Sequence, residues 1–301
     1  MLNLKRVLVV VDPDQADQPA LEKVLTLEKL ADFDITLLSC GYTQYLVEGY
    51  YFDAIDLPTL RQEFLDERKA TLESIAAPLR ENGLTVDTLS VWAHPAYEAT
   101  VREAVKLDAD LVVQHTRQHS ALSRLLLTHN DWQLVRCCPM PLLLVKETSW
   151  KDRPVLLAAV DPKHARHKPA GLDHKILDIT MDLSNTLKGD VFVTHSFSQI
   201  PLSGKHLQEA RQEHQRAFEE LLSGYDIPES HQRLTEEAPE FALSEMEREL
   251  EADVVIMGAI SRSIVSDVFI GSTTEKVLDF LECDVLIVKP EGFKTPVKLN
   301  D

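Results

Sequence analysis

Short runs of Val, Ile and Leu alternate along the chain with longer segments in which apolar residues recur at helical spacing. This alternation is typical of βαβ units, in which helices cover both faces of a parallel sheet. The pattern predicts five strands in each half of the chain. They lie at residues 6–12, 34–40, 84–92, 109–115 and 141–146, and at 154–161, 190–196, 230–236, 252–258 and 284–289. The strand at 230–236 is the least apolar, and a long helix is expected over 58–83, ending at Gly83.

The same pattern occurs twice. Residues 109–146 align without a gap with residues 252–289, and the Asp12-Pro13 that ends the first strand matches Asp161-Pro162. The sequence therefore predicts two copies of one domain, residues 1–147 and 152–292, joined by the linker ETSWKD and followed by a C-terminal tail at 293–301. The fold class is α/β, with two tandem, doubly wound, five-stranded parallel-sheet domains of the flavodoxin or Rossmann kind.

Charge and composition exclude several classes of function. With 49 acidic and 31 basic residues the net charge is −18, which repels nucleic acids and anionic membrane surfaces. The N-terminus enters a strand pattern without a cleavage site and no apolar run reaches the ~20 residues needed to cross a bilayer, so we expect a cytoplasmic protein. Cys40, Cys137, Cys138 and Cys283 lack zinc spacing and are expected to be reduced, mostly buried thiols.

Topology predicts where a ligand would bind. In an open parallel sheet, ligands bind beyond the carboxyl ends of the strands, where the strand order reverses. Asp12, His115, Asp161 and Gly258 all follow or end predicted strands. We therefore expect one candidate site at this edge of each domain.

The motifs at this edge resemble those of the universal stress proteins. The resemblance rests on the doubled domain, the Val-Asp-Pro after the first strand, the Gly-to-Gly-Ser segment between the fourth and fifth strands, and the segments HNDWQLVRCCPMPLLLVK and CDVLIVKPEGF. The layout is most similar to that of the tandem, E-type members. The resemblance implies the strand order 3-2-1-4-5, a pseudo-dimer of the two domains paired through their last strands, and a role in resistance to stress.

Some members of this family bind ATP through a glycine motif, Gly, two residues, Gly, nine residues, then Gly followed by Ser or Thr. Glycines of this kind let backbone N–H groups approach phosphate oxygens at a helix N-terminus. In the second copy Gly258, Gly271 and Ser272 match the motif, whereas Ser261 replaces the middle glycine. Arg262 and Thr273 are their neighbours, and Asp161 matches the family's aspartate at the nucleoside end.

In the first copy every motif position is replaced, since the equivalent residues are His115, Gln118, Thr128 and His129. The resemblance therefore implies that nucleotide binding is lost in the first domain and is weak or lost in the second. ATP with Mg²⁺ in the second domain is the one cofactor to consider. Ser272 with Glu275, and Thr128 with Asp131, also fit capping boxes that need no ligand.

Neither catalytic nor metal-binding motifs are found. The chain has no Gly-x-Ser-x-Gly, no Gly-Lys-Ser/Thr phosphate loop and no His-Glu-x-x-His. The pairs His115/His119 and His164/His167 lack a third ligand at zinc spacing, although His94 and His129 are candidates to join the first pair in a polar pocket.

The sequence thus favours a non-catalytic stress-response protein that acts by binding a ligand or partner. One rival is an ATP-binding switch or slow ATPase working through the second domain. The other is a carrier of an apolar small molecule under the aromatic segment 41–58, GYTQYLVEGYYFDAIDLP. Whether two chains pair into a homodimer stays open.

Overall fold

The structure is a computed structural model that describes residues 4–48, 57–116, 127–163, 171–197, 205–259 and 272–299. The strands of the first half are β1 (Arg6–Val10), β2 (Asp34–Gly41), β3 (Val86–Trp92), β4 (Leu111–His115) and β5 (Leu142–Val145). Those of the second half are β6 (Val155–Val160), β7 (Asp190–Ser196), β8 (Gln232–Thr235), β9 (Val254–Gly258) and β10 (Asp284–Val288). All ten lie within one or two residues of the segments that the apolar runs predict.

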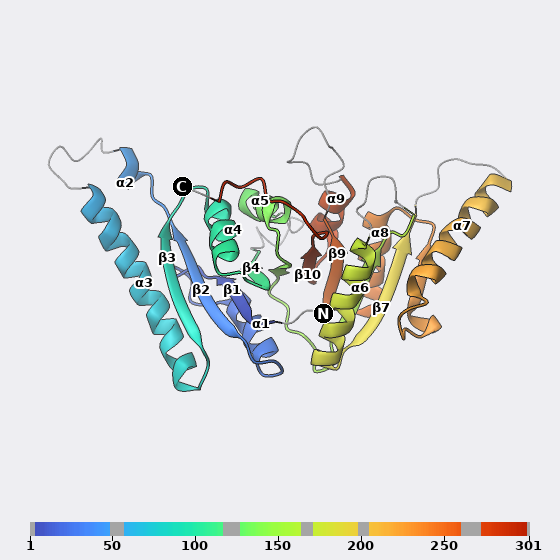
Figure 1. The fold of residues 1–301 in the computed structure, drawn as a ribbon, viewed down its shortest axis with the longest axis horizontal. Coiled ribbons are helices and arrows are strands. Elements are labelled where there is room, and N and C mark those ends of the chain that lie inside the picture. The colour runs from blue at the N-terminus through green and yellow to red at the C-terminus, as the bar shows by residue number, and fades with distance from the viewer. Residues whose placement is uncertain are drawn as a thin grey trace.

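Nine α-helices and one 3-10 turn connect the strands within the described residues (Figure 1). The first half contains α1 (Pro19–Glu28), α2 (Tyr45–Glu48), α3 (Leu57–Glu81), α4 (Ala96–Lys106) and α5 (His129–Cys137). The second half contains α6 (Leu172–Leu187), α7 (Lys205–Leu222), the turn η1 (Glu229–His231), α8 (Pro239–Leu250) and α9 (Ser272–Phe280). The predicted helix at 58–83 is α3, and Gly83 beyond its end has the left-handed φ of +93° expected of a C-terminal glycine.

The strands form one ten-stranded sheet in the order β3-β2-β1-β4-β5-β10-β9-β6-β7-β8. Each half therefore has the expected order 3-2-1-4-5, and neighbouring strands within a half are parallel. The two halves meet where β5 pairs antiparallel with β10, Leu143 lying opposite Leu286. The predicted pseudo-dimer through the last strands is confirmed.

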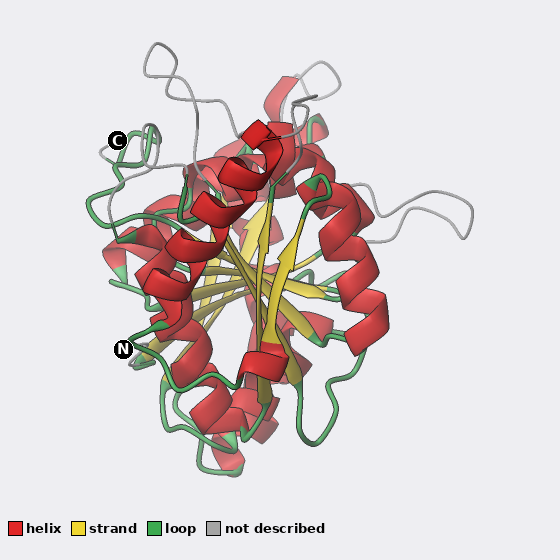
Figure 2. Ribbon diagram, turned by 90° about the vertical axis from the view of Figure 1, so that its right-hand side faces the viewer, coloured by secondary structure: helices red, strands yellow, loops and turns green. Residues whose placement is uncertain are grey.

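Helices cover both faces of the sheet (Figure 2), and a hydrophobic core lies between the helices and the strands on each face. One is made by α1, α3, α6 and α7, and the other by α4, α5, α8 and α9, each against alternate residues of the strands. Both cores contain side chains of β5 and of β10, so neither stops at the boundary between the halves. The halves are consequently joined by apolar packing as well as by backbone hydrogen bonds.

A buried ion pair also crosses this boundary. Asp284, at the start of β10, is fully buried and lies 3.0 Å from the Lys23 ammonium of α1. Its carboxylate also accepts hydrogen bonds from the Lys146 backbone N–H (2.7 Å) and the Trp150 indole (2.8 Å). The linker between the halves is thereby tied to both of them.

The C-terminal segment returns to the first half (Figure 1). The Arg102 side chain of α4 donates a hydrogen bond to the Lys298 carbonyl, at 2.8 Å, and Val297 is buried in the core on that face.

No helix among the described residues is long and apolar enough to span a membrane.

Candidate functional site

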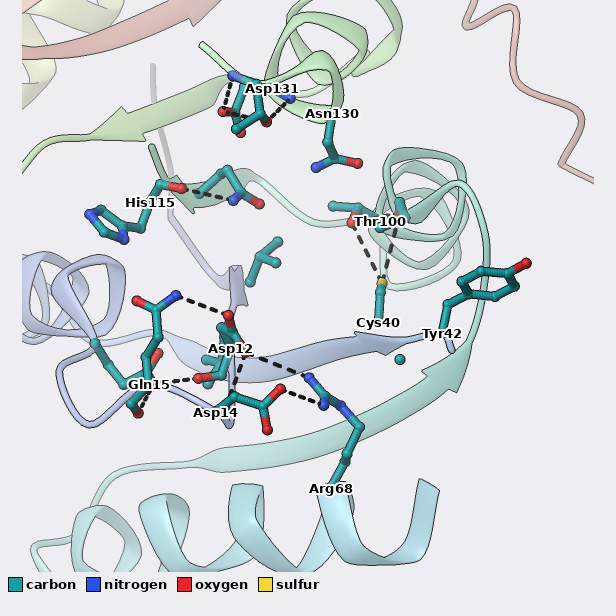
Figure 3. A pocket seen from close by; sticks show the side chains of 17 residues that line it. Asp12, Asp14, Gln15, Cys40, Tyr42, Arg68, Thr100, His115, Asn130 and Asp131 are labelled. Carbon is teal, nitrogen blue, oxygen red and sulfur yellow. Dashed lines mark hydrogen bonds and ion pairs between the residues drawn. The ribbon is translucent and has the colours of Figure 1, made fainter. Parts of the chain in front are cut away.

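A cavity of about 420 Å³ opens in the first half at the edge that topology predicts (Figure 3). It lies beyond the carboxyl ends of β1, β2 and β4 and beside the first turns of α4 and α5. Asp12, Asp14 and Arg68 project into it from one side, and Asn130 and Asp131 lie across from them. The walls are mostly polar, so the cavity suits a polar ligand better than an apolar one.

Asp12 organises the turn that leaves β1. Its carboxylate accepts a hydrogen bond from the Asp14 backbone N–H (3.1 Å) and another from the Gln15 amide (2.9 Å). Arg68 of α3 reaches the same place, where its guanidinium lies 3.6 Å from Asp12 and 2.9 Å from Asp14. It also donates to the Ser39 hydroxyl at 3.1 Å. The guanidinium in this cavity is thus already bound by two carboxylates.

The N-terminus of α5 is closed by its own side chains. Thr128 and Asp131 form the predicted capping box, in which the Thr128 hydroxyl accepts from the Asp131 N–H (3.2 Å) and the Asp131 carboxylate accepts from the Thr128 N–H (2.9 Å). Asp131 is 2% exposed, and burial raises the pKa of its carboxyl despite these hydrogen bonds. A carboxylate therefore occupies the place where a phosphate would meet the helix.

A thiol forms part of the wall. The Cys40 sulfur lies 3.8 Å from the Thr100 hydroxyl, and burial raises the pKa of the thiol to about 11. The thiolate needed for nucleophilic or redox chemistry is therefore scarce near neutral pH. All four cysteines are free, and three of them are buried.

The second half carries a different cluster at the equivalent edge. His195 of β7 is fully buried, its Nε2 lies 2.7 Å from Nδ1 of His214 on α7, and its Nδ1 lies 3.9 Å from the Asp161 carboxylate. Desolvation lowers the pKa of His195 to about 4. His195 is therefore neutral near pH 7, whereas Arg68 in the first half is always charged.

Gly258 has a packing role in the structure. A Cβ built on it would lie 2.8 Å from a terminal methyl of Leu172, the first residue of α6. The described backbone at Gly258 is not left-handed. Close approach of α6 to the end of β9 is thus sufficient reason for a glycine here, whatever else binds nearby.

The remaining predicted site residues are only partly within the described structure. Ser261, Arg262 and Gly271 lie outside the described residues, whereas Ser272 and Thr273 begin α9 but their side chains are not described. The proposed capping role of Ser272 and Glu275 accordingly stays a prediction. Asp161 and Gly258 are both at the expected strand ends.

The first-half histidines do not converge. His115 lines the cavity, but His94 stacks on Tyr42 at 4.3 Å between ring centroids, and His129 is exposed on α5. Residues 117–126 and 164–170, with the other predicted histidines, lie outside the described ranges. Among the residues with described placement, no three His, Cys, Asp or Glu side chains are grouped for a metal ion.

The aromatic segment is described only at its ends. Tyr42 contacts Trp92 and His94, whereas Tyr45 is 76% exposed. Residues 49–56 lie outside the described structure. The carrier hypothesis for this segment therefore stays a prediction.

Comparison with known families gives one match that covers most of the chain. The model of the universal stress protein family matches residues 3–146 and 188–289, that is, both halves. Among curated proteins, Universal stress protein E of Photorhabdus laumondii is 29% identical over 310 residues, covering 99% of each chain. Universal stress protein E of Escherichia coli K12 is 27% identical over 312 residues, covering 100% of this chain and 99% of the relative.

Solved structures share the fold. A protein of unknown function from Pseudomonas aeruginosa PAO1 superimposes with a TM-score of 0.77 at 24% identity, over 96% of this chain and 94% of that one. A putative universal stress protein from Pseudomonas aeruginosa UCBPP-PA14 gives a TM-score of 0.76 at 23% identity, over 96% and 95%. At this identity the likeness is one of architecture.

Proposed function

Because the chain belongs to the universal stress protein family, we propose that it is a cytoplasmic stress-response protein that acts by binding a ligand or partner and not by catalysis. Its first-half cavity is the binding site in this proposal, and the ligand there is not a nucleoside triphosphate. Nucleotide binding in the second half is weak or lost.

The observation that carries the proposal is the closed N-terminus of α5. A triphosphate at this edge needs the free N–H groups of a helix N-terminus and a positive surrounding. In this chain the Asp131 carboxylate takes that place, and Asp12 and Asp14 add negative charge on the opposite wall. Arg68 is bound by those two aspartates, so a triphosphate would have to compete with them for it.

The absence of turnover is supported by the state of the candidate nucleophiles and bases. Burial raises the pKa of the Cys40 thiol to about 11, so this wall of the cavity offers little thiolate near neutral pH. The described lining of the cavity is mostly polar, which suits binding of a polar ligand.

The test is a calorimetric titration of the intact protein with ATP and Mg²⁺, repeated with Asp12→Asn and Asp161→Asn. These two variants change equivalent aspartates, one in each half. We expect no saturable heat that depends on Asp12. Saturable heat lost in Asp12→Asn would overturn the proposal. Heat lost only in Asp161→Asn would leave the first-half proposal standing, but it would contradict weak or lost nucleotide binding in the second half and would favour the ATP-binding alternative there.

A further inference from the structure

The N-terminal part of α7, residues 205–217 (the α7 arm), lies at the outer end of the molecule, and its first turns lean away from β7 (Figure 1). The buried side chains described in α7 all lie beyond the arm, at Phe218, Leu221 and Leu222. From residue 208 to 217 every side chain is exposed or half-buried. The half-buried His214 is the residue through which the arm reaches the buried part of the sheet.

His214 contacts a histidine inside the fold. Its Nδ1 lies 2.7 Å from Nε2 of His195, which is fully buried on β7. The His214 ring also stacks on Phe197, with 4.0 Å between the ring centroids and 5° between the ring planes. These two contacts anchor the α7 arm to the end of β7.

The hydrogen bonds of His195 indicate where its protons lie. Nδ1 is 3.2 Å from the Val160 carbonyl, which can only accept, so Nδ1 carries a proton. In the neutral ring Nε2 is then an acceptor, and it receives the Nδ1–H of His214. A proton added at Nε2 would face that N–H group. The contact in its present form therefore requires a neutral His195, and with both rings charged two positive donors would meet at 2.7 Å.

The neighbouring charges do not offset the burial of His195. Burial lowers the pKa of the ring to about 4, although Asp161, 3.9 Å from Nδ1, and Asp173 of α6 both favour the charged form. Asp161 is 40% exposed, which weakens its attraction. Two partly exposed ion pairs flank the contact, Lys163 with Glu213 at 2.7 Å and Arg211 with Glu236 at 3.3 Å.

We propose that protonation of the His195–His214 pair releases the α7 arm from the carboxyl edge of the second half, so that the arm is an acid-sensitive switch. A charged imidazole is costly in the interior and is favoured in water, which reaches His195 when the arm moves away. Released, the arm is as short as the ~12–15 residues at which isolated helices are marginal in water.

The release alters the edge of the second half where topology places a ligand, because Asp161 and His195 both lie there. The switch thus makes this edge responsive to pH. It goes beyond the proposed function and does not depend on what binds in the first-half cavity.

The size of the effect follows from the two environments of His195. Its pKa is about 4 when the arm is docked, and the ordinary value of 6.5 is expected when the ring is in water. Because the released state binds the proton more readily, docking weakens as the pH falls below 6.5, and it weakens no further below pH 4. Between pH 7 and pH 5 the equilibrium constant for docking should fall about twentyfold. The Glu213 pair persists in this range, because the hydrogen bond from Lys163 lowers the pKa of Glu213.

The test is native-state hydrogen exchange of the full chain, measured by mass spectrometry and corrected for the intrinsic pH dependence of amide exchange. Amides of residues 209–217 are compared with those of β9, from pH 7 to pH 5 and at several low urea concentrations. The variants are His195→Gln, which cannot titrate, and the control His231→Gln. His231 also stacks on a phenylalanine, Phe192, at 4.1 Å and contacts the Val191 carbonyl at 2.9 Å, but these contacts are with β7 and not with α7.

We expect residues 209–217 to exchange through a small opening that urea barely affects, whereas β9 exchanges through one that urea strongly promotes. Exchange of residues 209–217 should accelerate about twentyfold from pH 7 to pH 5 in the wild type and in His231→Gln, but not in His195→Gln. Equal urea dependence of α7 and β9 would mean that α7 opens only on global unfolding and would overturn the inference. Acceleration that persists in His195→Gln would overturn it as well.

Imidazole NMR of the wild type is a second measurement that needs no variant of the buried histidine. The His195 ring should become charged over the same pH range in which the α7 arm loses its protection. A His195 ring that is charged at pH 5 while residues 209–217 keep their protection of pH 7 would show that protonation does not release the arm, and the inference would be wrong.

Discussion

Replacing Gly258 by alanine is expected to destabilise the protein by about 1 to 2 kcal/mol. The added Cβ would lie 2.8 Å from the Leu172 Cδ2, which is closer than ordinary packing allows. It would lie 3.4 Å from the Leu172 Cγ, which is at the lower limit of ordinary contact. Leu172 is 2% exposed at the start of α6, so its side chain has little room to turn away. Overpacking of this kind in a close-packed interior costs about 1–3 kcal/mol, and Gly258→Val should lie at the upper end of that range.

The assay is urea denaturation followed by circular dichroism, with Gly224→Ala as the matched control. A Cβ at Gly224 meets nothing within 4 Å and its φ is not left-handed, so we expect that variant to be unchanged or stabilised by up to about 1 kcal/mol. Gly258→Ala as stable as the wild type would refute the packing argument. If Gly258→Ala is destabilised as expected, Gly258→Val will be destabilised too. A loss of ATP binding in Gly258→Val would then not identify a phosphate contact, whereas Asp161→Asn does not carry this packing defect.

Three further predictions use the same denaturation assay. Thr128→Ala should cost about 1 kcal/mol by removing the cap of α5, and no loss would contradict the capping role. Asp284→Asn should lower the free energy of unfolding by about 3 kcal/mol or more, because it leaves the buried Lys23 ammonium without its carboxylate. The control Asp190→Asn removes an exposed pair with Arg153 and should lower it by under about 1 kcal/mol. The lowered pKa of His195 means that the unfolded chain binds a proton at this residue more readily than the folded chain does. The free energy of unfolding should therefore fall by about 3 kcal/mol as the pH drops from 6.5 to 4. The variant His195→Gln should not show this loss.

The fold could be predicted because two independent signals agree. Apolar runs placed the strands, and the internal repeat required that both halves share one topology. Strand ends were predicted less well, for local reasons. The predicted strand at 109–115 begins at Leu111, and just before it the Asp110 side chain accepts hydrogen bonds from the Lys5 and Arg6 N–H groups, at 2.8 and 2.9 Å, which an apolar pattern does not indicate.

The candidate site was only half predictable. Asp12 and His115 follow strands, so topology alone placed them at the carboxyl edge. Arg68 carries no such signal, because it is one of many charged residues on the 25-residue helix α3. Its arrival at Asp12 depends on how α3 packs across β2, which local sequence does not determine. His214 on α7 was missed for the same reason.

The equivalent positions of the two halves show how the sites have diverged. Val11 and Val160 both precede an Asp-Pro pair; the strand register pairs Val160 with His195, and Ser39 follows Leu38, which pairs with Val10. In the first half Ser39 accepts from Arg68, and in the second His195 contacts His214. The first site therefore keeps a permanent charge near its aspartate, whereas the second has His195, which is neutral above its lowered pKa. Because the aspartate is common to both halves and its neighbours are not, the electrostatic difference between the two edges comes from the residue on β2 or β7 and from the helix that follows, Arg68 on α3 or His214 on α7.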